Sequence, residues 1–332
     1  MGRRNGGYGS LMTAGFASVF RSFGRALTVA TLLIACTAEP APSSWVQRTS
    51  MEIARSEIPA AVVEETIYVP GGLVSTAQGV GVAASLEVYH AGTDTWKSAA
   101  DLPAARHHSM SAAVDGLVYL MGGFGDAFDP WATGWVFEPL PGGWSEIADL
   151  PLSVGAGAAA EIEGIIYVAG GVPLGTSLYA YDPLADTWAT LPSMTQPREH
   201  TAAVAYAGDL WVLGGRWDEA MLDTVEIFDP DTGSWSSGPS MQEARSGFGA
   251  TVLGDNIYVA GGEVFDLSNG FVATALDTVE QFDGEQWTLI EALPRRLHGA
   301  PLVTVGETIY LLSGSIEAAA ADNTGEVWSL QP

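Results

Sequence analysis

Arginine recurs at one fixed position of this sequence, where its charge could bind an anion. Four arginines each follow a tryptophan by ten residues: Arg55, Arg106, Arg198 and Arg245. Guanidinium groups hold carboxylates and similar anions through paired N–H donors. The alternative is a structural role, in which each arginine pairs with backbone or with a nearby acid such as Glu57 or Glu199.

Histidines accompany two of these arginines. His108 and His200 lie two residues after Arg106 and Arg198, and Arg296 precedes Leu297, which takes the arginine's position in the last repeat. No histidine or acidic residue recurs beside them at metal-ligand spacing, so we expect neither a metal nor a cofactor. The predicted ligand-binding residues are Arg55, Arg106, His108, Arg198, His200, Arg245 and Arg296.

One tripeptide could also perform acid/base chemistry. Arg198, Glu199 and His200 would supply an anchor for a substrate carboxylate beside a proton donor and acceptor, and they are the candidate catalytic residues. The sequence contains no Gly-x-Ser-x-Gly motif and no phosphate-binding loop. Hydrolase and nucleotide-dependent functions therefore have no support.

A regular spacing indicates which elements must position these side chains. Each of six tryptophans is followed 26 residues later by a pair of small residues, and the tryptophans recur every 44–52 residues. The tryptophans are Trp45, Trp96, Trp144, Trp188, Trp235 and Trp287, and the pairs begin at Gly71, Gly122, Gly170, Gly214, Gly261 and Ser313. Such a period predicts one body built from structural repeats.

Each repeat has the pattern of four short strands. In the fourth repeat, apolar runs at 201–206 and 210–213 flank a Gly-Asp turn, and 224–228 alternates polar and apolar residues. Trp235 then opens a last strand after an Asp-Pro turn. Four-stranded antiparallel sheets repeated radially make a β-propeller. The glycine pairs should be structural, because glycine lets two backbones approach closely.

These motifs resemble the Kelch repeat over residues 44–332. They include Ile-Tyr-Val-Ala-Gly-Gly at 166–171 and 257–262, and an aromatic residue before Asp-Pro with a tryptophan after it, at 181–188 and 228–235. The resemblance implies an all-β, six-bladed β-propeller of four-stranded antiparallel blades. The last repeat lacks a fourth-strand tryptophan, so a strand around Trp45 should complete that blade and close the ring.

Most length variation falls between the second and third strands of the repeats. The longest variable loops span 73–85, 124–134 and 263–277. In a four-stranded meander these loops share one face with the connections that carry the arginines. Binding specificity is expected on that face.

The N-terminus has the pattern of an export signal. Residues 1–26 are basic, 27–35 are apolar, and Leu33-Ile34-Ala35-Cys36 resembles the lipobox of bacterial lipoproteins. This resemblance implies a signal peptide at 1–35, lipidation of Cys36, a flexible tether at 36–43 and a propeller at 44–332. The alternative is ordinary cleavage near Ala35 with an incidental cysteine, and translation could also begin at Met12.

The chain is strongly acidic. Its 332 residues carry a net charge of −26, and the part after residue 35 holds 9 basic against 39 acidic residues. This charge disfavours nucleic acid as a partner and leaves the lipid anchor as the expected membrane contact. We expect a monomer that faces the periplasm or the cell exterior.

Three functions fit these patterns. The first is a binding module with an arginine-lined pocket for an anionic small molecule, glycan or protein loop. The second follows from resemblance in size and export to periplasmic six-bladed Kelch proteins that act as N-acetylneuraminate mutarotases. The third is a structural envelope protein. A copper-radical oxidase is disfavoured, because such an enzyme needs a cross-linked cysteine and Cys36 lies outside the repeats.

Overall fold

The computed structural model describes residues 44–218, 220–266, 272–317 and 322–332. Within Pro42–Pro332, which form one unit, this described part is all-β except for the short 3-10 helix η1 (Ala91–Thr93). A search of the same residues finds no helix with the length and hydrophobicity to span a bilayer. The predicted signal peptide, Cys36 and tether lie outside the described residues.

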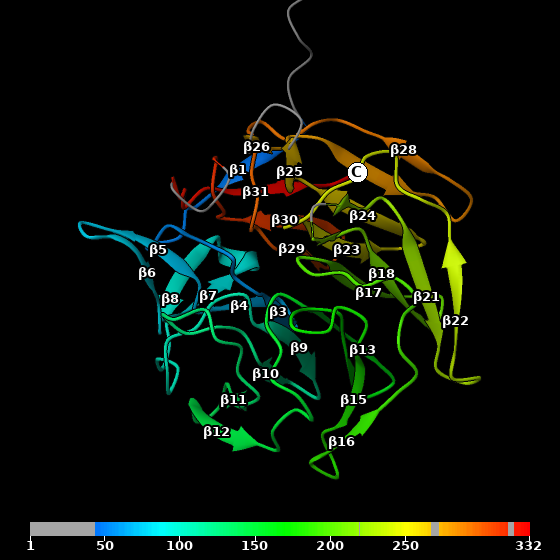
Figure 1. Ribbon diagram of the computed structural model, residues 1–332. Helices are drawn as coiled ribbons and strands as arrows, with labels where there is room; N and C mark the ends of the chain where they lie inside the picture. Colours follow the sequence, from blue (N-terminus) through cyan, green and yellow to red (C-terminus); the bar gives the residue numbers. More distant parts are fainter. Residues whose placement is uncertain (1–43, 219, 267–271, 318–321) are drawn as a thin grey trace, which may run out of the picture. The chain divides into compact units, whose positions relative to one another are not determined.

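Six four-stranded antiparallel sheets make up most of the structure (Figure 1). The first contains β3 (Ala61–Val63), β4 (Thr66–Pro70), β7 (Leu86–His90) and β8 (Thr95–Ser98). The second contains β9 (Met110–Val114), β10 (Leu117–Met121), β11 (Gly134–Glu138) and β12 (Gly143–Ile147). The third contains β13 (Ala158–Ile162), β14 (Ile165–Ala169), β15 (Leu178–Asp182) and β16 (Thr187–Thr190).

The next two sheets follow the same order. The fourth contains β17 (Ala202–Tyr206), β18 (Asp209–Leu213), β21 (Val225–Asp229) and β22 (Ser234–Gly238). The fifth contains β23 (Gly249–Leu253), β24 (Asn256–Ala260), β27 (Val279–Phe282) and β28 (Trp287–Leu289). These strands match the four-strand pattern predicted for each repeat.

The sixth sheet combines strands from both ends of the described chain. It contains β29 (Leu302–Val305), β30 (Thr308–Leu312), β31 (Val327–Leu330) and β1 (Val46–Arg48). β1 is antiparallel to β31, with Val46 opposite Ser329 and Arg48 opposite Val327. This is the pairing that the position of Trp45 predicts.

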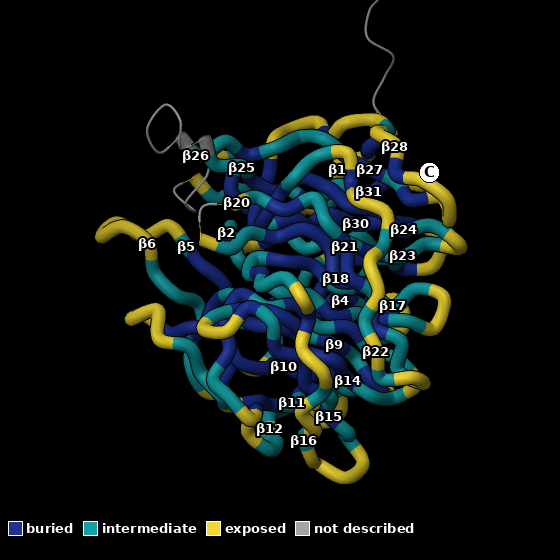
Figure 2. The backbone as a smooth tube through the Cα atoms, turned by 45° about the vertical axis from the view of Figure 1, so that its right-hand side comes forward, coloured by how far each residue is buried: buried dark blue, intermediate teal, exposed yellow. Residues whose placement is uncertain are grey.

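The hydrophobic core lies between neighbouring sheets. Met110 and Met121 of the second sheet, for example, pack with Ile166 and Val168 of the third. The second strand of each sheet is almost wholly buried, whereas many turns and loops are exposed (Figure 2). The first strands contact one another in sequence, β3 with β9, β9 with β13, β13 with β17, β17 with β23, β23 with β29, and β29 with β3.

Two contacts between sheets explain the constant spacing. The indole N–H of Trp96, Trp144, Trp188, Trp235 and Trp287 each donates to a carbonyl of the connection that follows the preceding sheet, at 2.7–2.9 Å. The second residue of each small pair donates its backbone N–H to a carbonyl in the following repeat. The acceptor is the residue ten positions after that repeat's tryptophan, as when Gly123 donates to Val154 at 2.8 Å. A Cβ on Gly122 would lie 2.2 Å from that carbonyl oxygen. The predicted structural role of the glycines is confirmed.

Three small sheets are built from the loops. They pair β2 (Arg55–Ser56), β5 (Leu73–Thr76) and β6 (Gly79–Val82), then β19 (Arg216–Trp217) with β20 (Ala220–Met221), and β25 (Glu263–Asp266) with β26 (Val272–Ala275). Except for β2, these strands lie between the second and third strands of their repeats, where the sequence predicts the variable loops.

Candidate functional site

The four spaced arginines lie inside the sheets. All four are fully buried, with at most 1% of the side chain exposed: Arg55, Arg106, Arg198 and Arg245. Each Nη1 donates to the first carbonyl of the small pair in its own repeat, at 2.6–3.0 Å. Each also donates to a carbonyl just before the third strand, at 2.9–3.1 Å.

The remaining face of each guanidinium is also occupied. Three of the arginines pair with a buried glutamate of the third strand: Arg55 with Glu87, Arg198 with Glu226, and Arg245 with Glu280. Arg106 instead lies 3.5 Å from the ring centroid of Trp135. These contacts favour the structural alternative for the four arginines.

Arg296, the fifth predicted arginine, is exposed. Neither it nor the four buried arginines lines the two cavities described below. Ligand contact by these five residues stays a prediction that neither of these two cavities supports.

The residues two positions further along the chain do face a pocket. The twelfth residue after each tryptophan has a left-handed φ of 48–61°: Glu57, His108, Ala156, His200, Gly247 and Gly299. From His108 to Gly299, each of these residues donates its backbone N–H to the carbonyl of the one before it, at 2.7–3.0 Å. We call these six residues the inner ring.

A second layer of side chains surrounds the inner ring. The residue just before each ring position pairs across a β-bridge with the residue that follows the small pair. His107 pairs in this way with Phe124, Glu199 with Arg216, Ser246 with Glu263, and His298 with Ser315. In each repeat, the segment before the ring residue and the segment after the small pair therefore lie side by side. Their side chains gather around the inner ring.

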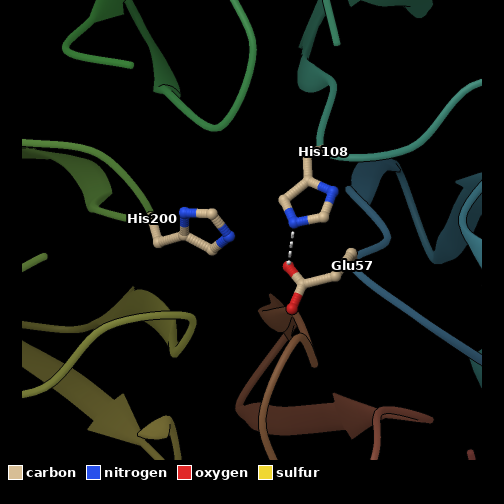
Figure 3. A group of neighbouring side chains, drawn as sticks. All are labelled: Glu57, His108 and His200. Carbon is tan, nitrogen blue, oxygen red and sulfur yellow. Dashed lines mark ion pairs between the residues drawn. The ribbon is translucent and has the colours of Figure 1, made fainter. Parts of the chain in front are cut away.

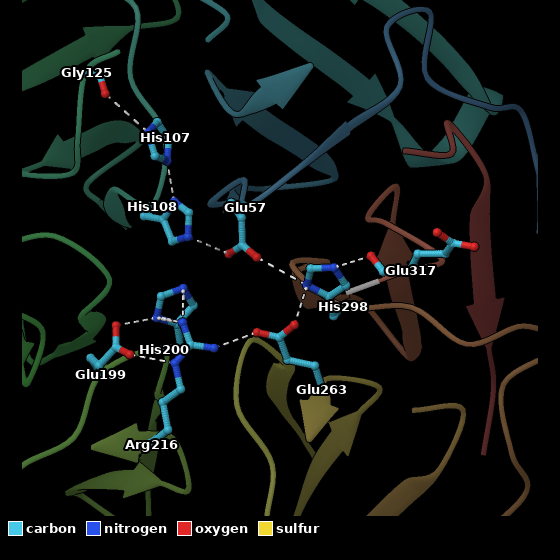
Figure 4. A network of polar contacts seen from close by, with 10 residues as sticks. All are labelled: Glu57, His107, His108, Gly125, Glu199, His200, Arg216, Glu263, His298 and Glu317. Carbon is cyan, nitrogen blue, oxygen red and sulfur yellow. Dashed lines mark hydrogen bonds and ion pairs between the residues drawn. The ribbon is translucent and has the colours of Figure 1, made fainter. Parts of the chain in front are cut away.

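Glu57 is the centre of one polar network (Figure 4). Its Oε2 lies 3.2 Å from Nε2 of His108, and its Oε1 lies 3.3 Å from Nδ1 of His298. Nε2 of His298 donates to the carbonyl of Glu317 at 2.7 Å. His108 continues the network through a short Nδ1–Nδ1 contact to His107.

Arg216 is the centre of the neighbouring network (Figure 4). Its Nε donates to Glu199 at 2.6 Å and its Nη1 donates to Glu263 at 2.7 Å. The other oxygen of Glu199 lies 2.5 Å from Nδ1 of His200. Of the three candidate catalytic residues, Glu199 and His200 therefore meet in the pocket, and Arg198 does not.

The two networks form the floor of a cavity of about 400 Å³. Its walls are mainly apolar, with Leu73, Phe124, Phe128 and Phe265. A second cavity, of about 180 Å³, shares Glu57, His108 and His200 and is otherwise lined by the starts of first strands and by the residues just before them. We call the first cavity the mouth pocket.

Burial and close contacts shift the pKa values of the floor residues. Burial would raise the pKa of Glu57, but the facing imidazoles of His108 and His298 outweigh it and hold that pKa below its ordinary range. Burial lowers the pKa of His108 to about 3. Burial would also lower the pKa of His298, but the Glu57 carboxylate raises it. Glu199 has a pKa of about 2, because His200 and Arg216 outweigh its burial.

Glu57, His108 and His200 point toward one another from three different repeats (Figure 3). One ligand atom from each lies within 4.8 Å of the other two, which is a grouping that could hold a metal ion. The sequence spacing gave no sign of it, because the three residues come together only through the inner ring.

Sequence reasoning found His108, Glu199 and His200 but missed Arg216, Glu263 and the aromatic wall. Arg216, Glu263 and Phe124 each follow a glycine pair directly. The signal that could have found them is this register, because the residue after each pair takes the same place in every repeat.

A family model named "Kelch motif" matches residues 197–242 and 244–294. These two segments, in the fourth and fifth repeats, therefore match the Kelch motif. Kelch-like protein terF of Aspergillus terreus is 28% identical over 53% of this chain and 43% of its own length. Alpha-scruin of Limulus polyphemus is 25% identical over 55% of this chain and 16% of its own length. The matched region is thus less than half the length of these curated relatives.

A solved structure, described as "Structure of YjhT", aligns with 84% of this chain and 95% of its own chain. The TM-score is 0.75 and the sequence identity is 15%. At this identity the likeness shows the fold alone, and it agrees with a β-propeller.

Proposed function

We propose that this protein is a binding module, a closed six-bladed β-propeller that takes a small anionic molecule into its mouth pocket. Closure is supported by the contact of β29 with β3 and by the pairing of β1 with β31. It is also supported by the hydrogen bond from Gly314 N to the Arg55 carbonyl, at 2.8 Å. That bond repeats, between the last and first sheets, the contact that links the other neighbours.

The observation that carries the binding proposal is an aromatic-walled cavity over a charged floor. Phe124, Phe128 and Phe265 offer faces for the apolar side of a ring, and the floor offers buried donors and acceptors. An acidic sugar fits this chemistry. Its hydroxyls would donate to Glu57 and Glu263, and its carboxylate would bind Arg216.

The test compares an acidic sugar with a neutral one by isothermal titration calorimetry, using N-acetylneuraminate and N-acetylmannosamine. We expect the acidic sugar to bind more tightly. Arg216→Met should remove that preference, by about tenfold or more, because a hydrogen bond to a charged group contributes about 1.5–3 kcal/mol. Phe128→Ala should weaken both sugars. Equal binding of the two sugars to the wild-type protein would refute an anion-selective pocket.

A second candidate is an acid/base enzyme such as a sugar mutarotase. It is supported by the contact between the Glu199 carboxylate and the His200 imidazole inside the pocket, beside Arg216. In this role Arg216, rather than Arg198, would hold the substrate carboxylate. Proton NMR of anomeric exchange in N-acetylneuraminate tests it, and an exchange rate unchanged by added protein would refute it.

We also propose that the propeller is tethered as a lipoprotein through Cys36, outside the cytoplasm. The proposal rests on the apolar segment at 27–35 and the lipobox-like residues that follow it. Cys36→Ser should move the protein from the membrane fraction to the soluble fraction of a bacterial host. A structural envelope role remains a third proposal, favoured if neither sugar binds and the tether is confirmed.

A further inference from the structure

We propose that the floor of the mouth pocket binds a divalent transition-metal ion, with zinc as the first candidate, through Glu57 Oε2, His108 Nε2 and His200 Nε2. Two imidazoles and one carboxylate are a common ligand set for zinc, with a further position open to water or substrate. The inference goes beyond the proposed binding of an acidic sugar and does not rest on it.

The three ligand groups are already close to the required geometry. Bonds of about 2.0–2.1 Å in a tetrahedral site place ligand atoms roughly 3.3 Å apart. Glu57 Oε2 and His108 Nε2 are 3.2 Å apart, so this pair already has that separation. The side chain of His200 must move closer, because the whole group lies within 4.8 Å. Its Nε2 must also exchange its present contact with Nη2 of Arg216, at 3.3 Å, for the metal.

Each histidine also has a partner on its other nitrogen. Nδ1 of His200 faces the Glu199 carboxylate at 2.5 Å, which can only accept a proton from it. Metal-binding histidines commonly donate their second N–H to a carboxylate or another acceptor in this way. The same arrangement holds for His108, whose Nδ1 contacts His107.

The direction of the His107 hydrogen bonds leaves His108 Nε2 without a hydrogen. Nε2 of His107 lies 3.3 Å from the carbonyl of Gly125, which can only accept, so His107 donates there. With both imidazoles neutral, Nδ1 of His107 must then accept from Nδ1 of His108. In this neutral state the lone pair of His108 Nε2 faces the Glu57 carboxylate, and a metal ion can take the place of the proton that would otherwise lie between these two acceptors.

The charges around the site favour a dication. Glu57, Glu199 and Glu263 stand against Arg216 and His298, and Arg216 is paired with Glu199 and Glu263. Oε2 of Glu263 is buried and makes no hydrogen bond to any described residue, and its ion-pair contact with Nδ1 of His298 is long, at 3.6 Å. Even with His298 charged, the floor carries one excess negative charge. A bound dication would reverse that sign and help to hold an anionic ligand.

The test uses full-length protein freed of metal with a chelator and titrated with zinc chloride, without any sugar. We expect one zinc per chain by calorimetry and by elemental analysis after dialysis. Glu57→Gln and His200→Gln should each weaken zinc binding at least about 100-fold, and His107→Gln about 10–100-fold through loss of the second partner. Cobalt(II) should give the intense visible bands of a tetrahedral site.

The matched control is His90→Gln, because His90 lies on β7 and lines neither cavity of the mouth. It should bind zinc like the wild-type protein. Equal zinc binding by wild type and His200→Gln would overturn the proposal. If both ligand variants fail to fold, a wild-type cobalt spectrum without tetrahedral bands would overturn it as well. Phe128→Ala should keep zinc binding and weaken sugar binding, which separates this proposal from the proposed function.

Discussion

A shift of two residues separates the structural arginines from the pocket. Arg106 and Arg198 donate to carbonyls within their own repeats, whereas His108 and His200, two positions on, line the cavity. The left-handed conformation of the ring residues turns the chain between these positions. Sequence spacing located the segment, but it could not show which of its side chains face inward.

Replacement of a buried arginine tests its structural role. Arg198→Met leaves the buried Glu226 carboxylate without its cation, and breaking such a pair costs about 3–5 kcal/mol. We expect the free energy of unfolding in urea to fall by at least about 3 kcal/mol. Arg296→Met, at an exposed position, should change it by less than about 0.5 kcal/mol. A stable Arg198→Met protein would return this arginine to the ligand-binding candidates.

An aspartate between the third and fourth strands of the third sheet makes the free energy of unfolding depend on pH. Asp186 accepts from Ala148 N and from the Tyr181 hydroxyl, both at 2.7 Å, and these bonds lower its pKa. Its contribution is complete above the unfolded pKa of about 3.9 and is lost as the pH falls through the lower folded value.

Asp186→Asn should therefore flatten the acid limb of the stability curve. The effect should be less than about 1 kcal/mol, because Asp186 is exposed to solvent. Urea unfolding of the two proteins between pH 5 and pH 2 measures it. Parallel curves over this range would show that Asp186 does not contribute.

The candidate site was only partly predictable because neighbouring repeats differ in residue type. His108, Glu199 and His200 could be found because they lie next to arginines that recur at a fixed spacing in this chain. The residue after each small pair is Leu73, Phe124, Val172, Arg216, Glu263 or Ser315. These residues share a register but no residue type, so the sequence does not show which of them line the pocket until the β-bridges to the ring segments are seen.

At the scale of strands and turns, prediction succeeded where a physical constraint repeats. The tryptophan N–H bonds and the close approach of the glycine pairs tie each sheet to the next, so their spacing cannot drift. The loop hairpins β5–β6 and β25–β26 carry no such constraint. The sequence predicts loops at these two places, but it does not predict the strands that the loops contain.

Two glycines of the second sheet separate the cost of conformation from the cost of close packing. Gly116 and Gly122 both have positive φ, at 78° and 59°, but only Gly122 faces another backbone. Gly116→Ala should cost about 1 kcal/mol for the left-handed conformation. Gly122→Ala should cost about 1–3 kcal/mol more, because its Cβ overlaps the Val154 carbonyl. Equal losses in urea unfolding would contradict a packing role for the pair.

At the scale of the whole molecule, charge should govern the response to salt. The net charge of −26 places repelling carboxylates over the surface, and added ions screen that repulsion. We expect the melting temperature to rise between low salt and about 1 M sodium chloride. A melting temperature that falls or stays constant would contradict this expectation.

The inner ring draws Glu57, His108 and His200 from the first, second and fourth repeats, and His298 reaches Glu57 from the last. No fragment of the chain can therefore display the complete site. A ligand of this site would bind only the folded molecule, so its binding would stabilise the folded state. At a free concentration 100 times its dissociation constant, the ligand would raise the free energy of unfolding by about 2.7 kcal/mol. If the proposed ligand binds, loaded molecules should therefore unfold less often than empty ones and should be cleaved more slowly by proteases.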